Sequence, residues 1–77
     1  MSGALEAAFD RAFELPAGTD HEALVYRESE GWDSLGHMTL VTELEDSFGI
    51  ELETDDIVEL TSFPAVREIL RRYGAEV

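Results

Sequence analysis

The spacing of apolar residues along the chain predicts helices separated by loops. Near the N-terminus the apolar positions recur at intervals of three and four, at Leu5, Ala8, Phe9, Ala12 and Phe13. These intervals place side chains on one face of an α-helix. The stripe ends at Leu15-Pro16, where proline disfavours helical conformation in the residue before it. The pattern therefore predicts a first helix over residues 4–15.

The longest predicted helix covers residues 34–48. Asp33 or Ser34 can cap its start, and Gly49 can supply the left-handed residue with which many helices end. At about 100° per residue, one narrow arc gathers Leu40, Val41, Leu44 and Phe48. We expect that arc to face the core. His37 falls on the same side, which favours a packed, hydrogen-bonded imidazole over a catalytic one.

The C-terminal part of the chain predicts a short helix and a longer one. The polar cluster Thr54-Asp55-Asp56 precedes an apolar stretch and is typical of a helix start, so a short helix is expected near residues 55–60. Pro64 is tolerated in a first helical turn. Beyond it, apolar residues stand at intervals of three and four: Val66, Ile69, Leu70 and Tyr73. With Gly74 as the stop, they predict a helix over residues 64–73.

Residues 16–32 form a long predicted loop, which we expect the apolar stretch Leu24-Val25-Tyr26 to hold against the helices. Strand alternation and internal repeats are both absent. The predicted fold class is therefore all-α: a small antiparallel bundle of three main helices plus one short helix, forming a single domain over residues 1–77. The residues expected to be largely buried are Leu5, Phe9, Phe13, Leu40, Leu44, Phe48, Ile57, Val66, Ile69 and Leu70.

The chain is strongly acidic, with 18 Asp and Glu residues against five Arg and no Lys, a net charge of −13. Such a surface repels nucleic acid and anionic membranes and attracts basic proteins. The lack of cysteine excludes disulfides and zinc–thiolate sites. Aligning Gly49 with the invariant glycine of a calcium loop puts Leu44 at the first ligand position, so no metal site is predicted. We expect a cytoplasmic protein that is monomeric when free and binds neither nucleic acid nor membrane.

The triplet Asp33-Ser34-Leu35 lies where an apolar stretch opens, inside a segment that contains eleven carboxylates and no cation between Arg27 and Arg67. Carboxylates around a serine oppose an oxyanion, and nothing nearby can act as its base. A triad of Ser34 with His37 fails because the i, i+3 spacing does not aim the ring at the hydroxyl, and the G-x-S-x-G elbow is absent. Ser34 is better suited to modification by a basic enzyme than to catalysis.

Residues from Trp32 to Leu60 resemble the acyl carrier protein family. The resemblance rests on Trp32, Asp33-Ser34-Leu35, Leu40, Leu44, Phe48-Gly49-Ile50, the acidic turn Thr54-Asp55-Asp56 with Ile57, and Leu60, and it extends from about Leu5 to Tyr73. It implies that Ser34, flanked by Asp33 and Leu35, carries covalent 4′-phosphopantetheine, whose thiol holds an acyl or aminoacyl group as a thioester. The chain would be a non-catalytic carrier, and itself the substrate of the enzymes that modify and load it. Its implied partners are a phosphopantetheinyl transferase, a loading enzyme, and downstream transferases or synthases with basic docking surfaces.

The residues after the triplet depart from the fatty-acid carriers, which tend to place acidic residues there. This chain has Gly36-His37-Met38-Thr39, and so looks more like discrete carriers of amino acids, glyceryl units or polyketide building blocks, and like D-alanyl carriers. Gly36 lowers helix propensity by about 1 kcal/mol relative to alanine. Close approach by an enzyme or by the pantetheine arm would account for it, and so would neutral drift.

The outward arc of the helix at 34–48 predicts a docking surface. It gathers Leu35, Met38, Thr39, Thr42, Glu45 and Asp46. Isolated apolar residues are common on protein surfaces, but Leu35 and Met38, the two apolar members of this arc, lie beside Ser34. We expect Leu35 and Met38 to supply apolar contact with partners and the two carboxylates to steer basic enzymes. The alternative is a plain acidic interaction module, such as an inhibitor or polyanion mimic, in which Ser34 is only a helix cap.

Overall fold

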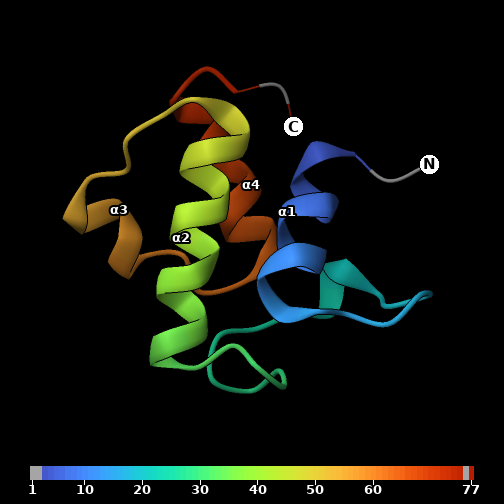
Figure 1. The fold of residues 1–77 in the computed structure, drawn as a ribbon. Coiled ribbons are helices and arrows are strands. Elements are labelled where there is room, and N and C mark those ends of the chain that lie inside the picture. Colours follow the sequence, from blue (N-terminus) through green and yellow to red (C-terminus); the bar gives the residue numbers. More distant parts are fainter. Residues whose placement is uncertain (1–2, 76) are drawn as a thin grey trace.

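The computed structural model describes residues 3–75 and 77 and contains a bundle of α-helices. In chain order the elements are α1 (Ala4–Phe13), the short 3-10 helix η1 (His21–Ala23), α2 (Ser34–Phe48), α3 (Thr54–Val58) and α4 (Phe63–Arg72). In Figure 1, α1 runs opposite to α2 and α4, while α3 lies to one side. Over the described residues the chain forms no strand beyond an isolated bridge. The all-α prediction is confirmed.

The helix ends follow local chemistry and differ slightly from the predicted bounds. Helix α1 stops at Phe13 because Glu14 takes a left-handed conformation, with φ 51°, two residues before the proline. Helix α4 begins one residue earlier than predicted, with the Ser62 side chain accepting a hydrogen bond from the Ala65 N–H. Gly49 ends α2 in the left-handed conformation that was predicted.

The core forms between α1, α2 and α4, and it draws several large side chains from the connections. Its buried apolar residues are Leu5, Ala8, Phe9, Leu24, Trp32, Leu40, Val41, Leu44, Leu52, Leu60, Phe63, Val66, Ile69 and Leu70. Seven of the ten predicted core residues are in this set. Phe13, Phe48 and Ile57 are only partly buried, so their prediction as largely buried is wrong. Phe13 and Phe48 occupy the last positions of their helices, and Ile57 belongs to the short peripheral α3.

The long connection before α2 is attached to the connection between α3 and α4. The Tyr26 N–H donates to the Thr61 carbonyl at 2.9 Å, and the Phe63 N–H donates to the Leu24 carbonyl at 3.0 Å. Val25 and Ser62 form an antiparallel bridge between these contacts. The predicted anchor at Leu24-Val25-Tyr26 therefore exists, and it fixes the path of the chain as it approaches Ser34. None of the described helices is both long and apolar enough to cross a membrane.

Candidate modification site at the start of helix α2

Ser34 is the first residue of α2, and its side chain is exposed. The preceding residue caps the helix: Asp33 Oδ1 accepts a hydrogen bond from the Gly36 N–H at 2.9 Å. The Asp33 backbone carbonyl also accepts from the His37 N–H at 2.7 Å. Because Asp33 performs the capping, the Ser34 hydroxyl is not needed to start the helix. This arrangement removes the main reason for treating Ser34 as a cap alone.

A cation that the sequence analysis did not assign to the site lies beside Ser34. Arg27 Nη1 is 3.5 Å from Ser34 Oγ, although the two residues are seven positions apart. Hydrogen bonding with Ser34, and secondarily with Arg27, lowers the pKa of the Tyr26 phenol. The Arg27 guanidinium carbon is 5.9 Å from the centre of the Tyr26 ring. Ser34 therefore faces one positive charge as well as the surrounding carboxylates.

His37 forms a structural link behind the serine. The Trp32 indole N–H donates to His37 Nδ1 at 2.9 Å, so the proton of the neutral ring is on Nε2, which donates to the Ile57 carbonyl at 2.8 Å. The ring is buried and lies nearly parallel to the Trp32 ring, edge to edge with it, with their centres 6.3 Å apart. The prediction of a packed, hydrogen-bonded imidazole is confirmed. Both nitrogens are engaged, and the ring ties α2 to α3.

Gly36 has an internal packing role that replaces the suggested approach of an enzyme or the arm. A Cβ atom at this position would overlap the carbonyl oxygen of Gly31 and would lie 3.2 Å from Phe13 Cε1. The loop backbone thus passes directly against the first turn of α2. A glycine inside a helix indicates that another group approaches the backbone closely, so the sequence predicted a close contact at Gly36. The approaching group is the chain's own loop.

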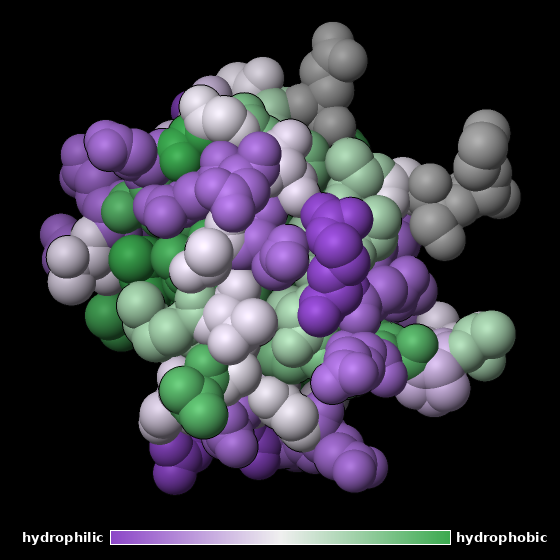
Figure 2. Space-filling model, in the orientation of Figure 1, coloured by the Kyte–Doolittle hydropathy of each residue, from purple (hydrophilic) through white to green (hydrophobic). Residues whose placement is uncertain are grey.

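The predicted docking surface is largely exposed. The exposed fractions are 79% for Leu35 and 53% for Met38, and Thr39, Thr42 and Asp46 are exposed as well. In Figure 2, hydrophobic residues reach the surface near the start of α2 and toward α3, among hydrophilic neighbours. Sequence analysis missed Val58 of α3, which is 71% exposed. Its position at the end of a five-residue helix left no periodicity to reveal it.

Glu45 differs from the other members of this surface because it has a role in the fold. It is partly buried, and its Oε2 accepts a hydrogen bond from the Leu52 N–H at 2.9 Å. The carboxylate therefore holds the connection between α2 and α3 against α2. Asp46, one position further, is the more accessible carboxylate of the predicted pair.

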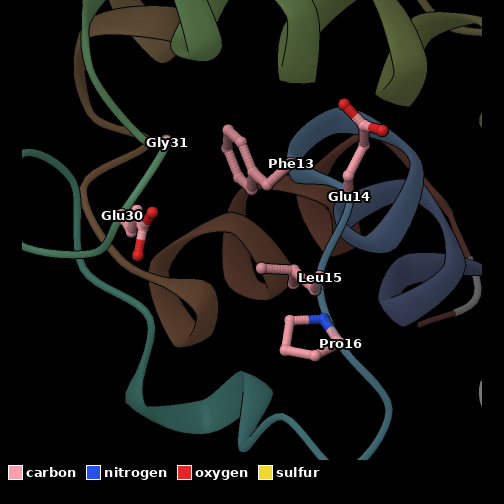
Figure 3. Close-up of a pocket in the computed structure, with 6 residues that line it drawn as sticks. All are labelled: Phe13, Glu14, Leu15, Pro16, Glu30 and Gly31. Atoms are coloured by element: carbon pink, nitrogen blue, oxygen red, sulfur yellow. The ribbon is translucent and has the colours of Figure 1, made fainter.

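A separate hollow of about 270 Å³ opens between the end of α1 and the loop before Trp32. Its lining residues are Phe13, Glu14, Leu15, Pro16, Glu30 and Gly31. Figure 3 shows the Phe13 ring and the Glu30 side chain on opposite sides of this space. Neither Ser34 nor Arg27 lines it. Within residues 3–75 and 77, no three His, Cys, Asp or Glu side chains come together as a possible metal site.

The geometry at Ser34 agrees with a comparison against protein families. The family model described as "Phosphopantetheine attachment site" matches residues 4–72, which include all four α-helices and the loop that carries Arg27. The chain belongs to this family. Searches of curated proteins and of solved structures gave no match.

Membership of this family confirms the resemblance to acyl carrier proteins and identifies the cofactor as 4′-phosphopantetheine. Phosphopantetheine-attachment domains bind 4′-phosphopantetheine covalently on a serine, and they are generally non-catalytic carriers. The match spans most of the chain, so the bundle as a whole is the attachment domain. An exposed hydroxyl at the start of α2 fits such a group, since a phosphate joined there meets the free amides and the positive end of a 15-residue helix.

Proposed function

We propose that this protein carries 4′-phosphopantetheine on Ser34 and presents an acyl or aminoacyl thioester on that arm to biosynthetic enzymes. The observation that supports Ser34 as the attachment residue is that Asp33 caps α2 and leaves the Ser34 hydroxyl exposed. An exposed hydroxyl is what a transferase requires of its protein substrate.

The other serines that the structure describes have different duties. Ser29 Oγ accepts from the Val25 N–H at 2.9 Å, and Ser62 Oγ accepts from the Ala65 N–H as the cap of α4. Ser47 Oγ accepts from Arg11 Nη2 at 2.6 Å. Modification of any of the three would displace a contact between parts of the fold. Among the described residues, the Ser34 hydroxyl accepts only a long 3.5 Å contact from Arg27 Nη1.

The proposed attachment is a phosphoryl-group transfer. The Ser34 hydroxyl oxygen attacks the coenzyme A phosphorus that bears the pantetheine, the pyrophosphate bond breaks, and adenosine 3′,5′-bisphosphate leaves. The hydroxyl proton passes to a base of the transferase. The carboxylates around Ser34 make a poor base for this step because Asp33 is committed to capping. We therefore assign the base to the transferase, together with the magnesium ion that the resemblance to acyl carrier proteins implies for this transfer.

We further propose that basic enzymes dock on the outward surface of α2 beside Ser34. Leu35 and Met38 supply apolar contact there, and Asp46 supplies long-range attraction. Met38 and Thr39 occupy exposed positions where fatty-acid carriers tend to be acidic. This difference supports a cargo from a specialised pathway, whereas Gly36 and His37 have structural roles and do not bear on the cargo.

Intact mass after incubation with coenzyme A and a promiscuous phosphopantetheinyl transferase tests the proposal. The wild-type chain should gain the mass of one phosphopantetheinyl group, and Ser34→Ala should gain none while keeping its helicity. Ser47→Ala is the matched control and should be modified fully. Modification of Ser34→Ala would refute the site. An unmodified wild-type chain would favour the acidic interaction module.

A further inference from the structure

We propose that Arg27 binds the phosphate that attachment to Ser34 introduces, and so holds the root of the arm against the loop before α2. This inference rests on the proposed function of Ser34. It assigns to Arg27 a positioning role toward the phosphodiester, with the Tyr26 ring beside the guanidinium.

The first argument is the distance between the guanidinium and the hydroxyl. Arg27 Nη1 lies 3.5 Å from Ser34 Oγ, which is long for a hydrogen bond to a hydroxyl. A phosphate bonded to Oγ places its non-bridging oxygens two bonds beyond Oγ, within the reach of the same side chain. The planar guanidinium offers several donors in a fork that matches phosphate oxygens. The side chain thus suits the modified serine better than the free one.

The second argument is charge. The chain has no cation between Arg27 and Arg67, and the net charge is already −13. A phosphodiester adds a further negative charge beside Asp33. Three arginines are engaged with carboxylates, in the pairs Arg11–Glu43, Arg67–Glu22 and Arg71–Glu68. Arg27 forms no such pair with the described residues, so its charge is available to the phosphate.

The third argument is the way in which the backbone holds Arg27. Its φ is 68°, a left-handed conformation that residues other than glycine adopt infrequently. The Arg27 N–H donates to the Trp32 carbonyl at 2.7 Å, and Trp32 is buried with its ring 5.3 Å from that of Phe9. Such a conformation persists where surrounding structure fixes it. The loop therefore directs Arg27 toward the start of α2 before any phosphate is present.

The fourth argument is the environment of the Tyr26 phenol. Hydrogen bonding with Ser34 lowers the pKa of Tyr26, and Arg27 contributes in the same direction. The guanidinium itself lies 3.5 Å from the Ser34 hydroxyl, measured from Nη1, and 5.9 Å from the centre of the Tyr26 ring, measured from its central carbon. The Tyr26 ring therefore lies beside the guanidinium and supports Arg27 without supplying charge.

The test compares the arginine side-chain N–H signals of the unmodified and modified wild-type chain by nuclear magnetic resonance. Attachment should shift the Arg27 guanidinium signals and produce a phosphorus coupling across the hydrogen bond. The Arg72 signals serve as an internal reference on the remote helix α4 and should not move. Arg27 signals that stay unchanged in a chain of confirmed modified mass would overturn the inference.

Matched variants give a second readout from the phosphorus itself. The ³¹P resonance of modified Arg27→Gln should shift away from the wild-type position and lose its dependence on salt, whereas Arg72→Gln should retain both. Arg27→Lys should recover part of the salt dependence because it keeps the charge without the fork. Identical ³¹P behaviour in Arg27→Gln and wild type would refute the role of Arg27. Should Arg27→Gln fail to fold, the wild-type comparison still decides.

Mass spectrometry separates the two proposals. A wild-type chain that accepts no phosphopantetheine overturns the function of Ser34 and the role of Arg27 together. A chain that is modified on Ser34, with Arg27 unaffected in both measurements, overturns only the role of Arg27.

Discussion

Replacing Gly36 with alanine should destabilise the protein, although the same change usually stabilises a helix. The position lies in the first turn of α2, where a Cβ atom would overlap the Gly31 carbonyl oxygen and approach the carbonyl carbon to 3.1 Å. Alanine gains about 1 kcal/mol of helix propensity over glycine. Whether that gain survives depends on how easily the loop moves away.

The loop around Gly31 has little freedom to move. Trp32 is 1% exposed, and its N–H donates to the Ser29 carbonyl at 3.1 Å while its own carbonyl accepts from the Arg27 N–H. Inserting a methyl group into well-packed structure costs about 1–3 kcal/mol, and an obstacle made of backbone favours the upper end of that range. We expect a net loss of about 2 kcal/mol in the free energy of unfolding after the propensity gain is subtracted.

Thermal or urea unfolding measures this loss. For a domain of this size a loss of about 2 kcal/mol lowers the melting temperature by roughly 8–16 °C. Thr39→Ala is the control on the exposed side of the same helix, where alanine should stabilise by about 0.5 kcal/mol. In Gly36→Ala, amide shifts should concentrate in residues 27–33. A Gly36→Ala chain as stable as the wild type would refute the packing role of the glycine.

Four further predictions use the same kinds of measurement. Leu44 is fully buried, so Leu44→Ala should lower the free energy of unfolding by about 2–5 kcal/mol in urea titrations. Self-repulsion at a net charge of −13 should make melting temperatures rise with added salt, and a fall would mean that ion pairs outweigh repulsion. The hydrogen bond to Asp56 raises the pKa of Tyr73. The stabilisation that this bond gives should therefore be present below the ordinary tyrosine pKa and be lost as the pH rises through the raised value. Tyr73→Phe lacks the titrating group and should show a flatter alkaline melting profile. Leu35→Ala should weaken transferase docking at every salt concentration, whereas Asp46→Arg should slow modification mainly at low salt. Modification rates that are equal for both variants and the wild type would place docking elsewhere.

Apolar periodicity was sufficient to predict the helices but not the whole core. A repeat of three and four residues reports one face of a regular helix, and α1, α2 and α4 follow it. Trp32 and Leu60 lie in connections, where no repeat exists, and both are fully buried. Phe63 stands at the first position of α4, ahead of the predicted start. Burial of these three depends on how the connections cross the bundle, which only the folded chain reveals.

The candidate site divides in the same way into local and long-range parts. Capping is a local property, so Asp33 and the exposed Ser34 could be inferred from the sequence. The approach of Arg27 to Ser34 depends on the path of its loop. That path is fixed by a bridge between Val25 and Ser62, which are 37 positions apart in the sequence. No periodic or capping signal encodes that bridge.

The acidic surface and the proposed phosphate site place opposite demands on the start of α2. The proposed docking of basic enzymes on α2 uses carboxylates for attraction, whereas a phosphodiester on Ser34 is destabilised by nearby carboxylates. The structure separates these demands in space: the exposed Asp46 lies toward the far end of α2, while Arg27 approaches Ser34 from the loop. Neutralising Arg27 should therefore alter the phosphate environment without altering the field that partners meet along α2. The two effects are separable by mutation because different elements of the fold carry them.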